Sequence, residues 1–232
     1  MMNEPAACNQ ILEVSNFNEL VATPFEGAIN AICWTRTLQG DFKEIVDKAS
    51  TNENITVLDP ANLASLELSK QGQLARAVLL ADFDLLKTHG AQPTLNIIRH
   101  YERDDANPFF PTDVYSFHAD RSPVPTDTFL CTYYGASSDI VPNAEATQKI
   151  GVPGIRDELK KLYNGPVEGF EDFLKEHFFD LHYMAATGAS IINLGIGNLW
   201  RLAIDHPESK VLPCIHRAPV ERNGESRLLM IC

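Results

Sequence analysis

The sequence predicts a mainly β protein with a helical N-terminal segment and a helical insertion. Up to about residue 92, apolar side chains recur at helical spacing. After Pro93, short runs rich in Ile, Val, Tyr and Phe alternate with Pro, Asp, Asn and Gly, which is typical of strands joined by turns. Two helical patterns interrupt this alternation between about residues 143 and 185. We therefore expect residues 1–92 to pack as a mostly helical segment on a β core formed by residues 93–232.

The N-terminal helices are predicted from apolar spacing and from helix-end signals. Residues 41–49 carry apolar side chains three and four positions apart. Asp59 precedes Pro60, an order typical of an N-cap followed by the first helical residue. The apolar pattern that begins there continues to residue 89, and Gly90 is a typical helix end. We expect a short amphipathic helix followed by a long helical stretch.

The β core is predicted from short β-branched and aromatic runs at regular spacing, which indicate a sandwich or a barrel. The helical patterns at residues 155–163 and 170–179 interrupt the series, so we interpret residues 143–185 as an insertion between two strands. The candidate strands are residues 94–101, 113–119, 127–134, 190–194, 198–204, 211–216 and 226–231.

Charge and cysteine content narrow the classes of partner. The 232-residue chain has 19 Lys and Arg against 31 Asp and Glu, and its formal charge of −12 repels polyphosphates. The chain has no basic run with interleaved aromatic residues, so we expect no nucleic-acid partner. The five cysteines are widely spaced and form no CxxC motif, which is typical of reduced thiols in the cytoplasm.

Neither a secretion signal nor a membrane span is predicted. Residues 1–5 lack the basic and apolar regions of a signal peptide. Residues 181–200 carry no formal charge, but they include three glycines and several polar side chains. We interpret them as buried strands and tight turns, and we expect a cytoplasmic protein without a membrane partner.

The residues that carry chemistry are His118 and Asp120, together with His216 near the end of the chain. Side chains two positions apart on a strand point to the same face, so an HxD pair directs an imidazole and a carboxylate to one point. Two His and one carboxylate form the facial set of non-haem Fe(II) oxygenases, which leaves three coordination positions open. We call His118, Asp120 and His216 the metal triad.

An arginine near the C-terminus is the candidate for binding an organic acid. Arg227 follows a predicted turn at Arg222-Asn223-Gly224, which would place its strand beside the strand of His216. A guanidinium binds a carboxylate through two parallel hydrogen bonds. An ordinary interstrand ion pair is the alternative interpretation of Arg227.

With these residues in place, the chain resembles the Fe(II)/2-oxoglutarate-dependent dioxygenases, whose core is a double-stranded β-helix (a jelly-roll or cupin-like fold). The matching pattern is HxD, a long gap, a His and an Arg about ten residues later. The segments FHADR, LCTYYG and HRAP also resemble an uncharacterised bacterial family at the edge of this superfamily. The resemblance covers roughly residues 93 to 232 in chain order.

The resemblance implies that the metal triad is the catalytic Fe(II) site of an oxygenase that hydroxylates a small molecule or a side chain. It implies that Arg227 holds the C5 carboxylate of the cosubstrate 2-oxoglutarate, helped by Tyr133 or Thr132, and that O₂ is the second cosubstrate. The gap before His216 is unusually long, and the predicted insertion accounts for the excess. The acidic-and-glycine turn usual in the family is replaced by GASSD at residues 135–139.

Two other functions remain open at this stage. One is a cupin-like metal-binding protein or enzyme without 2-oxoglutarate, holding Zn²⁺ or Ni²⁺, since such ligands also bind those ions. The other is a non-catalytic jelly-roll binding protein in which the metal triad never converges. No GxSxG, GxGxxG or GxxxxGK[ST] motif occurs, so hydrolase, dinucleotide and P-loop functions lack support.

Several residues near these motifs have plainer interpretations. Arg121 either contacts substrate or caps its strand. Cys214 is interpreted as a small buried hydrophobe. The remaining histidines singled out are interpreted as structural or exposed side chains rather than ligands: His100, His177, His182 and His206.

Overall fold

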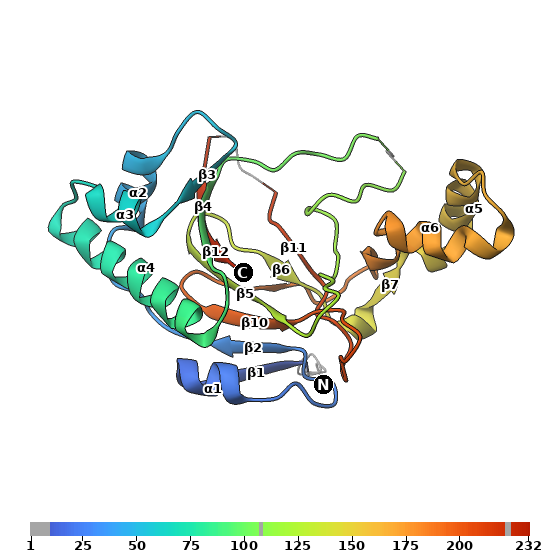
Figure 1. Ribbon diagram of the computed structural model, residues 1–232, viewed down its shortest axis with the longest axis horizontal. Coiled ribbons are helices and arrows are strands. Elements are labelled where there is room, and N and C mark those ends of the chain that lie inside the picture. Colours follow the sequence, from blue (N-terminus) through green and yellow to red (C-terminus); the bar gives the residue numbers. More distant parts are fainter. Residues whose placement is uncertain (1–9, 107–108, 221–223) are drawn as a thin grey trace, which may run out of the picture.

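The computed structural model describes residues 10–106, 109–220 and 224–232, and a seven-stranded sheet lies at its centre (Figure 1). Neighbouring strands are antiparallel except for the first pair, which is parallel. In spatial order the strands are β1 (Ile11–Val14), β2 (Ala31–Trp34), β10 (Leu199–Ala203), β5 (Asp127–Tyr134), β12 (Arg227–Ile231), β4 (Thr94–Ile98) and β3 (Ile55–Leu58).

A second, smaller set of strands carries the HxD segment. It contains β11 (His216–Arg217), β6 (Asp139–Ile140) and β9 (Ile192–Asn193), and a separate pair, β7 (Ala146–Gln148) and β8 (Tyr183–Ala185). Isolated bridges connect His118 to His216 on one side and to His182 on the other. The HxD segment therefore lies between β11 and the residues that lead into β8.

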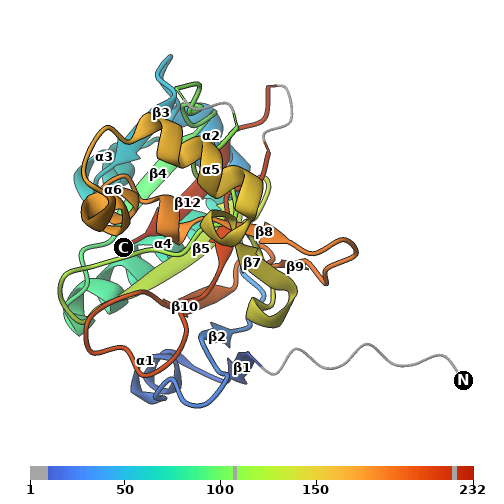
Figure 2. The same cartoon turned by 90° about the vertical axis from the view of Figure 1, so that its right-hand side faces the viewer.

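The helices occupy two separate places. One group comes from the N-terminal part of the chain: α1 (Phe17–Ala22), α2 (Phe42–Ala49), α3 (Pro60–Ser65) and α4 (Lys70–His89). The other comes from the insertion: α5 (Pro153–Leu162), α6 (Phe170–Glu176) and the 3₁₀ turns η1 (Asn143–Glu145), η2 (Lys149–Gly151), η3 (Val167–Gly169) and η4 (Phe179–Leu181). Figure 1 shows α4 and the α5–α6 pair on opposite sides of the large sheet, and Figure 2 shows the insertion from its own side.

The predicted helix ends are confirmed, and two helices lie within the range predicted as an insertion. The Asp59 side chain accepts a hydrogen bond from the Asn62 backbone N–H, and Pro60 is the first residue of α3. Gly90 ends α4 with φ +101°, a left-handed conformation that favours glycine. Helices α5 and α6 share a small apolar core that includes Phe110, Leu159 and Leu174.

The two faces of the large sheet bury different cores, and β5 faces both. Phe129, Cys131 and Tyr133 belong to the core under α2 and α4. Leu130 belongs to the second core, which also contains Ile140 of β6. Because side chains alternate along a strand, Thr128 and Thr132 point to the same side as Leu130, towards the small set of strands.

The N-terminal prediction was incomplete, because residues 1–92 also supply β1, β2 and β3 to the large sheet. The apolar run of β2 is only four residues long and fully or partly buried. A buried run this short has no periodicity that separates a strand from a helix turn. The architecture is therefore mixed α/β.

Two predicted strands are much shorter than expected. Within residues 113–119 only His118 makes a bridge, because Asp113 forms a turn instead: its carboxylate accepts from the Tyr115 N–H at 3.1 Å and its carbonyl from the Ser116 N–H at 3.2 Å. Within residues 211–216 only His216 belongs to a strand. The predicted turn before Arg227 falls on Arg222 and Asn223, which lie outside the described residues.

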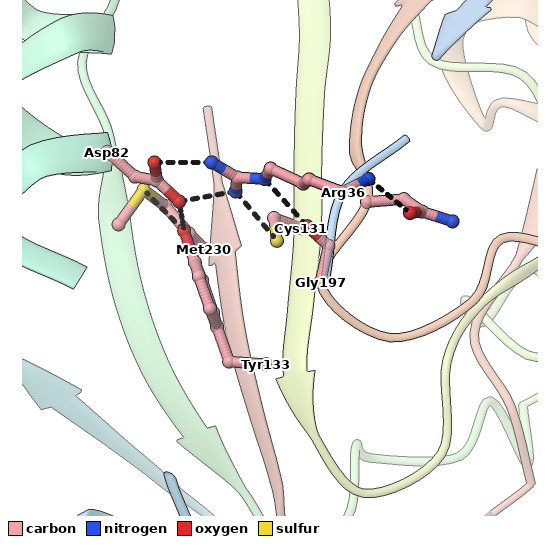
Figure 3. A network of polar contacts seen from close by, with 7 residues as sticks. Arg36, Asp82, Cys131, Tyr133, Gly197 and Met230 are labelled. Atoms are coloured by element: carbon pink, nitrogen blue, oxygen red, sulfur yellow. Dashed lines mark hydrogen bonds and ion pairs between the residues drawn. The ribbon is translucent and has the colours of Figure 1, made fainter. Parts of the chain in front are cut away.

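A buried polar network ties α4 to the large sheet (Figure 3). The Arg36 guanidinium makes a two-pronged ion pair with Asp82 of α4, and its Nε donates to the Gly197 carbonyl at 2.7 Å. The Tyr133 hydroxyl donates to the same carboxylate at 2.6 Å. Burial raises the pKa of Tyr133 well above its ordinary value, so the hydroxyl stays a donor.

We expect Asp82→Ala to lower the free energy of unfolding by about 3–5 kcal/mol, because it leaves the buried Arg36 charge without its carboxylate. Urea unfolding followed by circular dichroism measures the change. Asp84→Ala is the matched control, since Asp84 is exposed on the same helix, and it should cost less than about 0.5 kcal/mol. Equal losses in the two variants would contradict a structural role for the network.

Candidate metal centre

Backbone pairing brings the metal triad together. The His118 N–H donates to the His216 carbonyl at 2.9 Å, and the His216 N–H donates back to the His118 carbonyl at 2.8 Å. Asp120 follows two residues after His118, and one ligand atom from each of the three side chains lies within 4.8 Å of the others. The Asp120 carboxylate is 3.9 Å from His118 Nε2 and 3.7 Å from His216 Nε2. The predicted convergence is therefore present.

The ring orientations leave both Nε2 atoms available as ligands. His118 Nδ1 lies 2.8 Å from the Ser116 carbonyl, and His216 Nδ1 lies 3.5 Å from the Cys214 carbonyl. A carbonyl only accepts, so each Nδ1 carries the proton and each Nε2 presents its lone pair. The Thr128 hydroxyl donates to Asp120 Oδ2 at 2.6 Å and fixes the rotation of that carboxylate.

The protonation states suit metal binding. Burial, together with the neighbouring His216, lowers the pKa of His118 to about 4. Burial acts to raise the pKa of Asp120, but His216, the Thr128 hydrogen bond and His118 outweigh it, and the net shift is downward. Near pH 7 the triad therefore presents a neutral imidazole beside a carboxylate, the forms that bind a divalent cation.

This donor set fits a divalent transition metal. Two imidazole nitrogens and one carboxylate oxygen are the ligands of Fe(II) oxygenase sites, and they also suit Zn²⁺ and Ni²⁺. The second alternative from the sequence, a jelly-roll protein in which the three side chains stay apart, does not agree with this geometry.

Arg227 lies between the large sheet and the small set of strands, with only 4% of its surface exposed. Its guanidinium donates to Thr132 Oγ1 of β5 at 3.3 Å and to Ser138 Oγ at 3.1 Å. Ser138 lies two residues before Ile140, which pairs with His216. The guanidinium therefore contacts the residue that leads into β6, the strand that pairs with His216.

The structure brings Thr132 to Arg227 but places Tyr133 elsewhere. Tyr133 points to the opposite face of β5, where its hydroxyl contacts Asp82 and Met230. The expected help from Tyr133 in cosubstrate binding is therefore not supported, because adjacent strand residues face opposite sides.

The structure shows the contacts of Arg121 and Cys214, whose roles the sequence left to simpler interpretations. Arg121 forms ion pairs with Asp180 of the insertion at 2.5 Å and with Asp205 at 2.6 Å, so it fastens the insertion to the core. Cys214 is 1% exposed in the core between the sheets, as expected for a small buried hydrophobe.

A cavity of about 280 Å³ opens beside the metal triad. Its lining includes His118 and Asp120 of the triad, Arg121 and His182, and the apolar residues Val114, Ala119, Phe178 and Leu181, with Thr112 completing the set. This volume lies near the lower end of the roughly 300–1,000 Å³ typical of small-molecule sites. The insertion thus supplies one wall of the cavity.

His182 is the residue of this site that the sequence interpretation missed. It is 4% exposed, and its ring centroid lies 5.8 Å from that of His118. No local motif marked it, because it lies near the end of the insertion and reaches the HxD segment through backbone pairing. The Ala119 N–H donates to the Leu181 carbonyl at 2.9 Å, and the Tyr183 N–H to the Phe117 carbonyl at 2.7 Å.

Comparison of the chain with protein-family models, with curated proteins and with solved structures finds no match. Among the described residues, no helix combines the length and apolar composition needed to cross a bilayer.

We expect His118→Ala and His216→Ala each to weaken binding of Zn²⁺ or Co²⁺ by more than about 100-fold, because each removes a ligand from a three-residue site. Isothermal titration of metal-free protein measures the change, and circular dichroism verifies that the fold is retained. His177→Ala is the control, since His177 is exposed on the insertion outside the cavity. Wild-type affinity in either ligand variant would refute the assignment.

The metal-free protein should lose stability as the pH falls from 6.5 to 4. In this window the unfolded chain binds a proton at His118 that the folded protein excludes, because the folded pKa of about 4 lies below the unfolded value of 6.5. We expect a loss of about 3 kcal/mol from this residue, measured by urea unfolding with chelator at several pH values. The loss should shrink in His118→Asn, and an unchanged slope in that variant would contradict the assignment.

Proposed function

We propose that this chain is a non-haem Fe(II)- and 2-oxoglutarate-dependent oxygenase that hydroxylates a small molecule or a side chain. The observation that carries the proposal is the convergence of His118, Asp120 and His216 beside a cavity. A second observation in support is the buried Arg227, a cation held by Thr132 on the face of the large sheet that is turned to the small set of strands.

The chain path supports a double-stranded β-helix as the core of the proposed enzyme. After β4 in the large sheet, the chain passes to His118 in the small set, back to β5, and across to β6 and β9. It then returns to β10, crosses to β11 and ends in β12. Alternation between two facing layers, with the apolar core of Leu130 and Ile140 between them, agrees with a jelly-roll arrangement.

The position of Arg227 supports a dicarboxylate cosubstrate. The buried guanidinium contacts Ser138, which leads into β6, and β6 pairs with the strand of His216, so a dicarboxylate bound at the metal triad would extend towards it. One carboxylate would meet the open side of the metal and the other would meet Arg227 through two hydrogen bonds. Thr132 and Ser138 hold the guanidinium in place for this contact.

Each residue of the site would have a separate role in the proposed reaction. The metal triad would hold Fe(II), which when bound supplies dioxygen activation coupled to oxidative decarboxylation of the cosubstrate. Thr128 holds the Asp120 carboxylate in one rotation, and Arg227 neutralises the distal carboxylate of the cosubstrate. The apolar residues Leu181 and Phe178 line the cavity and would contact the apolar part of the substrate.

A metal-binding protein without 2-oxoglutarate is the second candidate. It is favoured by the two hydroxyl groups that already accept hydrogen bonds from Arg227. In that protein Arg227 would be a structural link between the layers, and Zn²⁺ or Ni²⁺ would occupy the metal triad.

Titration of anaerobic Fe(II)-loaded protein with 2-oxoglutarate separates the two candidates. We expect a weak visible charge-transfer band that saturates, and a half-saturating concentration at least tenfold higher in Arg227→Met, because the ion pair to the distal carboxylate is lost. Arg217→Met is the control, since Arg217 pairs with Asp139. Stoichiometric Fe(II) with no band would favour the metal-only protein.

A further inference from the structure

Ser116 contacts two histidines of the site in different ways. Its backbone carbonyl accepts from His118 Nδ1 at 2.8 Å, and its hydroxyl oxygen lies 3.2 Å from His182 Nδ1. Lys149 of the insertion donates from Nζ to the same hydroxyl oxygen at 2.6 Å. One serine therefore connects a metal ligand, a histidine of the cavity wall and a half-buried cation.

The donors and acceptors in this chain of contacts determine the tautomer of His182. The Lys149 ammonium can only donate, so Ser116 Oγ accepts from it. In the part of the chain that the structure describes, His182 Nδ1 is the acceptor available to the Ser116 hydroxyl proton. With the Ser116 hydroxyl as the donor in this contact, His182 Nδ1 is bare and the proton of the ring lies on Nε2.

The Nε2–H group of His182 would find a hydrogen-bond acceptor in a ligand bound in the cavity. The ring is 4% exposed and lines the cavity, and within the described residues no acceptor for Nε2 is present. Nε2 is not one of the fully enclosed polar atoms that lack a partner among the described residues, so it is accessible and a molecule bound in the cavity can accept a hydrogen bond from it. This tautomer also explains why His182 does not join the metal triad: Nε2 carries a proton, and the lone pair of Nδ1 is occupied by Ser116.

We propose that His182 binds the substrate, donating a hydrogen bond from Nε2 to a carbonyl or carboxylate oxygen of a small molecule with an apolar body. The inference rests on the proposed function only in taking the cavity beside the metal triad as the substrate site. The oxygen acceptor pairs with His182, and the apolar body contacts Val114, Phe178 and Leu181. Ser116 and Lys149 are positioning residues, since they act through the His182 ring.

The charges around the cavity agree with this class of ligand. The Lys149 ammonium contacts His182 through the Ser116 hydroxyl, and its positive charge disfavours a cationic group next to His182. Arg121 is already paired with Asp180 and Asp205, so it leaves no strong positive charge to demand an anion. With a divalent ion on the Asp120 carboxylate of the lining, we therefore expect the cavity to accept a neutral carbonyl as well as a carboxylate and to disfavour an ammonium.

The tautomer is tested first, in Zn²⁺-loaded protein with ¹⁵N-labelled histidine. Long-range ¹⁵N–¹H correlation spectra should show His182 protonated at Nε2 and bare at Nδ1. His177 is an internal reference of the opposite tautomer, because its Nδ1 lies 3.0 Å from the Phe173 carbonyl. Ser116→Ala should abolish the preference of His182. A proton on His182 Nδ1 in the wild-type protein would overturn the proposal.

Ligand class is tested next with benzamide, which offers a carbonyl oxygen, and benzylamine, which offers a cation and no oxygen. Benzamide should move the His182 Nε2–H resonance, and its Kd should rise about tenfold in His182→Leu because one buried hydrogen bond is lost. His182→Gln, which keeps an N–H donor, should recover part of the affinity, and His177→Leu should change nothing. Benzylamine should bind at least tenfold more weakly than benzamide.

Equal affinity for the two compounds, or benzamide binding unaffected by His182→Leu, would overturn the substrate-binding role. These measurements need neither Fe(II) nor 2-oxoglutarate. A missing charge-transfer band would therefore count against the oxygenase alone, while a wrong tautomer would count against His182 alone.

Discussion

The pairing of the His118 and His216 backbones is the interaction on which the rest of the site depends. Two reciprocal hydrogen bonds of 2.9 and 2.8 Å join the middle of the chain to a segment close to its end. Without that pairing the imidazoles would have no common position, and Asp120 would be an ordinary partly exposed carboxylate. With it, three ligand atoms lie within 4.8 Å of one another, in a place that the large sheet keeps rigid through β5.

The same segment uses its other edge to hold the insertion. Phe117 and Ala119 pair with the residues around His182, so α5 and α6 are attached directly beside the metal triad. The ion pairs of Arg121 with Asp180 and Asp205 reinforce this attachment. One short stretch of backbone therefore positions both the metal triad and the wall of the cavity beside it.

Strand β5 contributes side chains to both faces of the large sheet, one towards the metal triad and the other towards helix α4. Thr128 and Thr132 face the small set of strands and contact Asp120 and Arg227. Tyr133 faces α4 and belongs to the network of Arg36 and Asp82. Because the side-chain period of a strand is two, neighbouring residues of one segment serve unrelated purposes.

The sequence by itself determined the elements whose signals are local: the Asp59-Pro60 helix start, the Gly90 helix end, the strand at residues 127–134 and the HxD pair. Its HxD pair and distal His also predicted the three residues that converge, although the sequence did not give the distances between them. Only the tertiary structure decided that β1, β2 and β3 join the large sheet, that Tyr133 faces away from Arg227, and that His182 lines the cavity. These depend on pairing between segments far apart in the chain, and a short run carries no information about its partner strand.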